Sequence, residues 1–233
     1  MSHASRPRTN RLILEHLEDR RMLTLVFNEY AVNNIGKPAH AMAPVDFDQD
    51  GDIDVVTSGV EWYENRGDLA FTVHSIADHG MSERVVPVDF DGDGDLDILT
   101  KTYNQNPTFG EVVWFENNGE MQFTRRFISS APDVPWDVVP ADLDNDGDMD
   151  VIVGANMDGK LFWIEQTQAG FVEHEIQRNS ISPGIRTVFA IDMENDGDVD
   201  IVVGDLGGRV AWLENDGSQG FTEHEVAIDD WVE

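Results

Sequence analysis

The sequence has 233 residues, of which 40% are hydrophobic and 9% aromatic, and this composition predicts a folded globular chain. Its formal net charge is −31 at pH 7, and it carries no basic stripe, which argues against binding to nucleic acid. Cysteine is absent, which excludes disulfides, thiol nucleophiles and zinc–thiolate sites.

The first 24 residues, MSHASRPRTNRLILEHLEDRRMLT, are basic, whereas the remainder of the chain is acidic. They contain a short amphipathic helical pattern but lack the uninterrupted apolar core of an ordinary secretory signal peptide. The run LEHLEDRRML is similar to a leader motif at the start of many large exported repeat proteins of bacteria. We therefore expect residues 1–24 to be an export-type leader, with a disordered or partner-docking arm as the alternative. No stretch approaches the roughly 18 apolar residues of a membrane span.

From residue 25 the chain repeats a unit of roughly 50 residues, at about 27–76, 77–128, 129–176 and 177–233. Each unit contains an acidic loop, and we number these loops 1 to 4 and count positions from the first acidic residue. The loops read DFDQDGDIDVV from Asp46, DFDGDGDLDIL from Asp89, DLDNDGDMDVI from Asp142 and DMENDGDVDIV from Asp192.

Each loop places acidic side chains at positions 1, 3, 5, 7 and 9 and glycine at position 6. Alternate carboxylates around a tight glycine turn suit a hard cation with about six to eight oxygen ligands, and we expect about four calcium ions. Position 7 is expected to contribute its backbone carbonyl, and the position-2 side chains (Phe47, Phe90, Leu143 and Met193) to point into the core. The expected metal-site residues are Asp46, Asp48, Asp50, Asp52, Asp54, Asp89, Asp91, Asp93, Asp95, Asp97, Asp142, Asp144, Asp146, Asp148, Asp150, Asp192, Glu194, Asp196, Asp198 and Asp200.

An EF-hand or dockerin loop would need a bidentate glutamate at position 12 and a helix after it. Position 12 is threonine or valine in all four loops, and an apolar run with strand character follows each one. The EF-hand interpretation therefore fails, and each loop is expected to connect two strands.

Three further apolar segments accompany each loop. The first precedes the loop. The second contains the pattern Trp-x-Glu and reads VEWYEN, VVWFEN, LFWIEQ or VAWLEN. The third begins with phenylalanine at residue 71, 123, 171 or 221. Four short strands per repeat predict an all-β fold, a β-propeller of four-stranded blades with calcium loops. The tryptophans, in phase on doubly buried strands, are expected to be core residues.

The ends of the repeat array also resemble parts of blades. FNEYAV at 27–32 looks like the closing strand of a preceding blade, and AIDDWVE at 227–233 looks like the opening of a following one. Four blades are evident, so we expect a small four-bladed ring, an open arc completed by another chain, or a fragment of a longer propeller. An uncovered terminal strand favours a homo-oligomer or a larger propeller.

The loops, their following strands and the downstream aromatic strands together resemble FG-GAP and VCBS repeats, the calcium-binding propeller repeats of integrin α-subunit head domains and many bacterial surface proteins. The resemblance covers about residues 27–233. It implies a protein or glycan binding or adhesion module that is extracellular or attached to the cell surface, where calcium is near millimolar. Glu194 departs from the motif in loop 4, which leaves the affinity of that site open.

A propeller lectin, or a non-catalytic fragment of a carbohydrate-active enzyme such as a polysaccharide lyase, is the alternative function. The non-repeated insertion YNQNPTFG at 103–110 is the first candidate for ligand binding, through Tyr103 and Phe109. His74, His174 and His224 share one repeat position and are interpreted as repeat features. The sequence has no nucleophile elbow, zinc-protease motif or phosphate loop, so we assign no catalytic residue and expect no enzyme.

Overall fold

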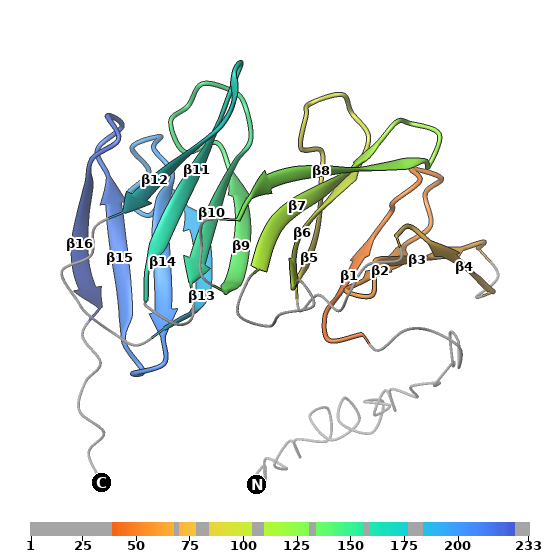
Figure 1. Ribbon diagram of the computed structural model, residues 1–233, viewed down its shortest axis with the longest axis horizontal. Coiled ribbons are helices and arrows are strands. Elements are labelled where there is room, and N and C mark those ends of the chain that lie inside the picture. The colour runs from red at the N-terminus through yellow and green to blue at the C-terminus, as the bar shows by residue number, and fades with distance from the viewer. Residues whose placement is uncertain are drawn as a thin grey trace, which may run out of the picture. The chain divides into compact units, whose positions relative to one another are not determined.

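A computed structural model describes residues 39–67, 70–77, 84–103, 110–130, 134–155, 159–176 and 184–226 (Figure 1). Over these ranges the fold is all-β, with sixteen strands in four antiparallel sheets of four strands each. Each sheet follows chain order, which confirms the prediction of propeller blades. All of these strands belong to one compact unit, Asn33–Glu233. The expected leader and the segments 27–32 and 227–233 lie outside the described residues.

The first sheet contains β1 (Met42–Val45), β2 (Asp54–Thr57), β3 (Glu61–Asn65) and β4 (Phe71–Ser75). The second sheet contains β5 (Val85–Val88), β6 (Asp97–Tyr103), β7 (Gly110–Asn117) and β8 (Phe123–Ser129). The third sheet contains β9 (Pro135–Ala141), β10 (Asp150–Ala155), β11 (Leu161–Thr167) and β12 (Gly170–Ile176). The fourth sheet contains β13 (Ile185–Ile191), β14 (Asp200–Asp205), β15 (Val210–Asn215) and β16 (Phe221–Val226).

Loops 1 to 4 each connect the first strand of a sheet to its second strand, as the sequence predicts. The four acidic loops therefore occupy equivalent places in four equivalent sheets. Within the described ranges, no helix has the length and apolarity needed to span a bilayer.

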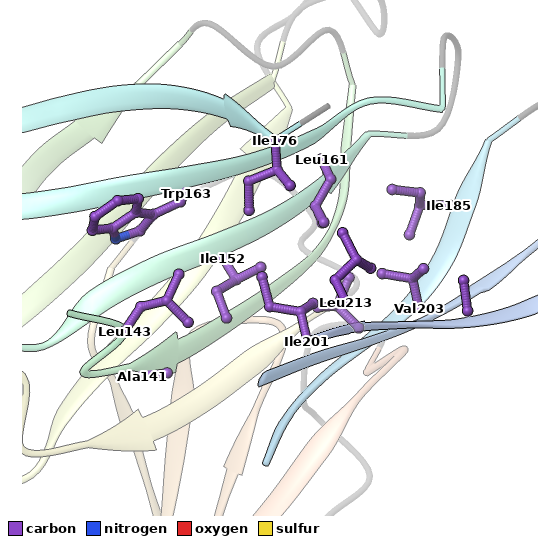
Figure 2. Close-up of a cluster of buried hydrophobic side chains, with 12 residues drawn as sticks. Ala141, Leu143, Ile152, Leu161, Trp163, Ile176, Ile185, Ile201, Val203 and Leu213 are labelled. Carbon is purple, nitrogen blue, oxygen red and sulfur yellow. The ribbon is translucent and has the colours of Figure 1, made fainter. Parts of the chain in front are cut away.

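Strand β10 shows how neighbouring sheets share a core. All of its residues are buried. Val151 and Val153 belong to a cluster with Leu99 of the second sheet, whereas Ile152 packs in a cluster with Ile201 of the fourth sheet (Figure 2). Successive side chains of a strand point to opposite faces, so a strand covered on both faces is apolar throughout.

The repeated tryptophans lie where adjacent sheets meet. Trp62, Trp114 and Trp163 are buried, which confirms the prediction that they are core residues. Trp212 of the fourth sheet is only half-buried. The tryptophan face of each of the first three sheets is covered by the next sheet along the chain.

The position-2 side chains follow the same rule. Phe47, Phe90 and Leu143 are almost fully buried against the following sheet, as predicted. The expectation that Met193 also points into the core is wrong, because its side chain is largely exposed. The described part of the chain contains no fifth sheet that could cover it.

Candidate metal centre

Loops 1, 2 and 3 each gather three carboxylates around one point. In loop 1, oxygen atoms of Asp46, Asp48 and Asp50 all lie within 4.8 Å of one another. Loop 3 gathers the same positions 1, 3 and 5, and loop 2 gathers positions 1, 3 and 9. The fold therefore brings side chains at odd positions together, and each group has the all-oxygen character that calcium prefers.

Backbone amides fix these carboxylates within the loop. The Gly51 amide donates to Asp46 Oδ2 at 3.1 Å. The Asp50 amide donates to Asp48 Oδ1 at 3.3 Å, and the Asp52 amide to Asp50 Oδ1 at 2.9 Å. Loops 2 and 3 repeat all three bonds. The loop is thus folded by the same carboxylates that would bind a cation.

The backbone of each loop has positive φ at two positions. The position-6 glycines have φ between 97° and 101°, a region that is accessible to glycine and strained for other residues. Position 4 also has positive φ, for example 60° at Gln49 and 60° at Asn145. This second left-handed position was not predicted, although glycine at position 4 of loop 2 and asparagine at position 4 of loops 3 and 4 are a recognisable signal for it.

One carboxylate oxygen in each of the first three loops has no hydrogen-bond partner among the described residues. The Oδ1 atoms of Asp46, Asp89 and Asp142, all at position 1, are buried and accept no hydrogen bond from the described residues. A buried carboxylate oxygen is costly unless it is hydrogen-bonded or coordinates a metal. The donor set of loops 1 to 3 therefore fits a divalent cation of the calcium type.

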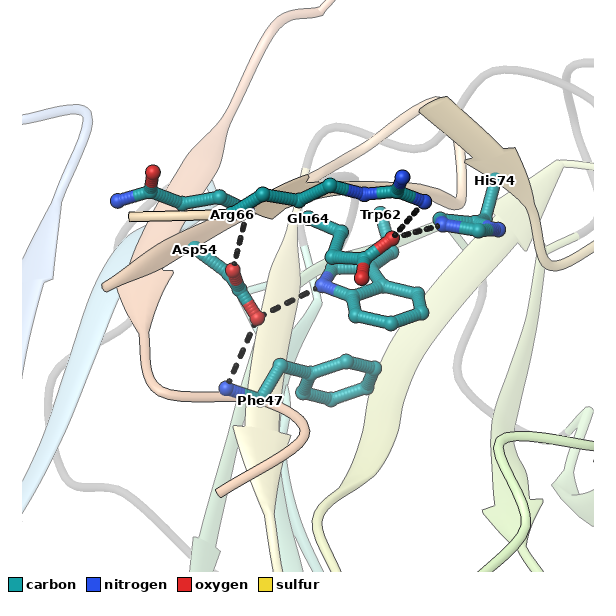
Figure 3. A network of polar contacts seen from close by, with 7 residues as sticks. Phe47, Asp54, Trp62, Glu64, Arg66 and His74 are labelled. Atoms are coloured by element: carbon teal, nitrogen blue, oxygen red, sulfur yellow. Dashed lines mark hydrogen bonds and ion pairs between the residues drawn. The ribbon is translucent and has the colours of Figure 1, made fainter. Parts of the chain in front are cut away.

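The position-9 aspartates tie each loop to the third strand of its sheet. Asp54 is fully buried, and its Oδ2 accepts hydrogen bonds from the Phe47 amide at 3.2 Å and from Trp62 Nε1 at 2.8 Å (Figure 3). Its Oδ1 accepts from the Asn65 amide at 2.7 Å. Asp150 makes the equivalent bonds, including one from Trp163 Nε1 at 2.8 Å. These bonds, which we call the position-9 clamp, were not predicted, although the recurrence of aspartate and tryptophan in every repeat is a signal for them.

The position-7 carboxylates lie elsewhere. A Cβ atom added to Gly67, in the turn between β3 and β4, would lie 2.8 Å from Asp52 Oδ2, and equivalent turn glycines approach Asp95 and Asp198 in the same way. These carboxylates therefore face the neighbouring turn, and none of them belongs to the three-carboxylate groups of the described loops.

Loop 4 differs from the other three loops. Asp192 Oδ1 accepts a hydrogen bond from the Asp196 amide at 3.2 Å, so its position-1 oxygen already has a partner. Glu194 is one methylene longer than aspartate, and its carboxyl group lies close enough to Asp200 for the two to share a proton. Trp212 Nε1 is buried without a partner among the described residues, whereas Trp62 donates to its position-9 aspartate. In loop 4, groups of the loop itself therefore contact the carboxylates of positions 1 and 3.

Crowding of carboxylates changes their titration. Burial, and after it the charges of neighbouring carboxylates, raises the pKa of Asp48, Asp91 and Asp144. Burial raises the pKa of Asp97 and Asp150 to about 6, although N–H donors oppose the shift. A bound divalent cation would favour the charged forms and lower these pKa values.

In loop 4 the same effects act on Glu194. Desolvation, followed by the hydrogen bond and the charge of Asp200, raises the pKa of Glu194 to about 7. A shared proton can satisfy this pair near neutral pH without a cation.

A second repeated arrangement lies on the outer strands. His74 stacks on Trp62 with ring centroids 4.4 Å apart, and its Nε2 lies 2.7 Å from Glu64 Oε2 (Figure 3). The third and fourth sheets repeat both contacts. In the second sheet Arg126 replaces the histidine and bonds to Glu116 at 2.6 Å. These contacts support the interpretation of the histidines as repeat features.

Tyr103 and Phe109 are the candidate ligand-binding residues of the insertion at 103–110. Phe109 and the side chain of Tyr103 lie outside the described residues. Their role therefore stays a prediction.

Comparison with known proteins identifies the repeats. The family model of the FG-GAP-like repeat matches residues 46–100 and 103–153, which contain loops 1, 2 and 3. No curated protein matches the sequence.

Two solved structures are similar to the chain. A lectin from Agrocybe aegerita, described as recognising non-reducing terminal N-acetylglucosamine, has a TM-score of 0.55 and 18% identity over 82% of this chain and 52% of the lectin chain. The V. cholerae biofilm matrix protein Bap1 has a TM-score of 0.33 and 14% identity over 74% of this chain and 34% of that protein. The chain thus spans about half the length of the lectin, and at this identity the similarity shows the fold alone.

The sheet topology, the position of the acidic loops and the family match all indicate the same type of repeat. The sheets have four strands in chain order, an acidic loop follows the first strand of each, and the family model covers the first three of these loops. The chain therefore contains FG-GAP-like repeats over residues 46–153.

Proposed function

We propose that this chain is a calcium-stabilised module of the β-propeller type that binds a protein or a glycan outside the cell or at its surface. The observation that supports the proposal best is the buried position-1 oxygen in each of loops 1, 2 and 3, for which the described residues offer no hydrogen-bond donor. A calcium ion would be held by the gathered carboxylates, at positions 1, 3 and 5 in loops 1 and 3 and at positions 1, 3 and 9 in loop 2, and by the position-7 carbonyl.

Bound calcium would act mainly on stability and rigidity. It would supply the positive charge that each crowded loop lacks and would fix the connection between the first and second strands of its sheet. Three divalent ions would reduce the net charge from −31 to about −25. Loop 4, in which Asp192 and Glu194 already have partners, would bind calcium more weakly than the other loops.

The cellular location follows from the calcium affinity that we propose. Open, largely exposed loops of this kind bind calcium in the range found outside cells, near millimolar. We propose a binding or adhesion role without catalysis, because the repeated glutamates are already paired with histidine or arginine and are not arranged as an acid–base pair.

Calorimetric titration of chelator-treated protein with calcium tests the metal part of the proposal. We expect about three ions to bind, one for each unpartnered position-1 oxygen. Asp46→Asn should remove one ion, whereas the matched control Asp52→Asn, at position 7 of the same loop, should leave the number unchanged. Absence of uptake, or equal loss in both variants, would overturn the proposal.

A cavity beside the third sheet favours a glycan as the ligand. It has a volume of about 320 Å³ and combines apolar walls with side chains that can bond to hydroxyl groups. Its lining residues are Trp163, His174, Glu175, Ile176, Gln219 and Phe221. A sugar ring could place its C–H face on the apolar wall and its hydroxyls toward the polar side chains. The fold similarity to a lectin supports this choice.

Titration with an N-acetylglucosamine-terminated oligosaccharide, followed by tryptophan fluorescence, tests the glycan. Gln219→Ala should weaken binding by about tenfold, the effect of one lost hydrogen bond. The matched control is Gln122→Ala, an exposed glutamine at the equivalent turn of the second sheet. A glycan that binds both variants equally does not occupy this cavity, and the calcium result is unaffected by that outcome.

A further inference from the structure

The fourth sheet leaves uncovered the face that each earlier sheet buries. At position 2 of the loops, Phe47 and Phe90 are 1% exposed and Leu143 is 2% exposed, whereas Met193 is 47% exposed. The four loops occupy equivalent places in their sheets, so the difference in exposure arises from what covers them. Each of the first three is covered by the next sheet.

Other apolar side chains extend the uncovered area. Phe189 is 60% exposed on β13 and lies opposite Val202, which in turn lies opposite Trp212. Cross-strand partners point to the same face of a sheet, so these three side chains lie together. Ile191, two residues after Phe189, is also exposed on this face. We call Phe189, Ile191, Met193, Val202 and Trp212 the open tryptophan face.

The first sheet shows the converse. The first-strand residues at one equivalent register are Met42, Val85, Val138 and Val188. The three valines are buried where their sheet covers the preceding one, whereas Met42 is 66% exposed. On the first sheet, the face that the later sheets use to cover a predecessor is therefore accessible at Met42, although Tyr63 on the same face is buried.

The three internal interfaces show how the two faces fit. Between the third and fourth sheets, Trp163 and Ile152 of one sheet pack with Ile201 and Leu213 of the other (Figure 2). The first and second sheets, and the second and third, form the same kind of core. In every case a tryptophan face meets the aliphatic face of the next sheet.

We propose that a second copy of this chain covers the open tryptophan face with its first sheet, head to tail. The new contact would be a fourth example of an interface that the chain already makes three times. Two copies would contribute two such contacts related by a twofold axis, and together they would hold eight sheets, within the range of about four to eight blades of propellers.

Contacts between neighbouring loops give the register of this docking. Gln49 Nε2 donates to the Gly94 carbonyl of the next loop at 2.8 Å, and Asn145 Nδ2 donates to Asp198 Oδ1 of the next loop at 2.8 Å. Both donors occupy position 4. Asn195 is the position-4 residue of loop 4 and is exposed. In the proposed contact it would reach position 6 or 7 of loop 1 in the second copy, at Gly51 or Asp52.

Light scattering of the full chain measures its mass in solution. At about 100 μM, well above the Kd of a micromolar interface, we expect twice the mass of one chain. Phe189→Glu should convert the protein to single chains, because it would bury an unpaired charge. The matched control Phe127→Glu alters a phenylalanine of similar exposure, 52%, on β8 and should leave the mass unchanged.

Cross-linking tests the register without relying on a disruptive variant, because the chain contains no cysteine. Asn195→Cys combined with Asp52→Cys should be joined between two chains by a short bifunctional thiol cross-linker, which spans more than a disulfide does. Asn145→Cys combined with Asp198→Cys is the positive control, since that pair should cross-link within one chain. Asn195→Cys alone should give no cross-linked dimer.

Three results would overturn the proposal. The first is a single-chain mass at about 100 μM, as expected if a different polypeptide covers the face. The second is equal sensitivity of the mass to Phe189→Glu and Phe127→Glu. The third is failure of the Asn195→Cys and Asp52→Cys pair to cross-link between chains while the control pair cross-links.

Discussion

Loops 1 and 4 have the same acidic spacing and the same glycine, yet they differ in their readiness for a cation. In loop 1 the Oδ1 atom of Asp46 is buried with no donor among the described residues, and Trp62 donates to the position-9 aspartate. In loop 4 the equivalent oxygen of Asp192 accepts a hydrogen bond from a backbone amide, and the Glu194 carboxyl group lies beside Asp200, the position-9 aspartate. The longer acidic side chain at position 3 of loop 4 accompanies this difference between the two loops.

The two loops also differ in what lies beside them. Loop 1 sits against the second sheet, which buries Phe47, whereas Met193 of loop 4 is exposed. Repeats with the same acidic spacing therefore differ in cation site and in burial where an acidic side chain is longer and where a neighbouring sheet is absent from the described residues.

Withdrawal of calcium should produce the largest effect, because it acts on loops 1 to 3 together. At a free calcium concentration about 100 times the Kd, each occupied site adds about 2.7 kcal/mol to the free energy of unfolding. Urea unfolding with and without a chelator measures the difference. The triple variant Asp46→Asn, Asp89→Asn and Asp142→Asn should unfold identically in both buffers. A chelator effect of full size in that variant would assign the metal to other residues.

Loss of the position-9 clamp should have the next largest effect. Asp150→Ala leaves three N–H donors without their acceptor, two backbone amides and the Trp163 indole, and should reduce the free energy of unfolding by about 3 to 5 kcal/mol. Asp200→Ala should have a smaller effect, because the Trp212 indole already lacks an acceptor in the described structure. Urea unfolding of both variants in chelator measures the difference. Equal losses would show that the indole bond adds nothing.

Exchanging aspartate and glutamate at position 3 of loops 3 and 4 tests whether side-chain length controls calcium binding. Glu194→Asp should open loop 4 and raise the number of bound calcium ions by one, whereas Asp144→Glu should close loop 3 and lower it by one. Calorimetric titration measures both numbers. The two variants carry the same net charge as the wild type, so charge alone cannot explain opposite changes. Unchanged numbers in both would mean that side-chain length does not control the sites.

The smallest expected effect concerns pH in the metal-free protein. Asp97 and Asp150 have a pKa of about 6 in the folded state, above the ordinary value of 3.8. Between these values the folded state binds more protons at these two groups than the unfolded state, so the stability that they contribute is fully present below about pH 4 and is lost as the pH rises through about 6. Melting temperatures in chelator should fall over this interval, and calcium should remove the decline. A rise over the same interval without metal would contradict the assignment.

Much of the fold could be predicted because its signals are local. The alternation of Val151, Ile152 and Val153 specifies a strand buried on both faces, and glycine at position 6 specifies a left-handed turn. Recurrence of these signals in each repeat fixed the number of sheets. The convergence of the carboxylates of positions 1, 3 and 5 could be predicted for the same reason, since it depends only on the loop backbone.

The position-9 clamp could not be predicted from the loop alone. Asp54 meets the Trp62 indole because β3 pairs with β2, and the resulting bonds depend on strand register. The closure of loop 4 depends on the reach of Glu194 across the folded loop. Such contacts are decided by distances in the assembled sheet, which spacing along the sequence does not contain.

The repeat, the strands and the acidic loops follow from the amino-acid sequence alone, because backbone conformation and side-chain alternation are local properties. Which oxygens are buried without a donor, and which apolar faces are covered, depends on how the sheets pack together. Phe47 and Met193 occupy the same repeat position, yet one is buried and the other exposed. Burial depends on the sheet that packs alongside, and a repeat cannot encode its own neighbour.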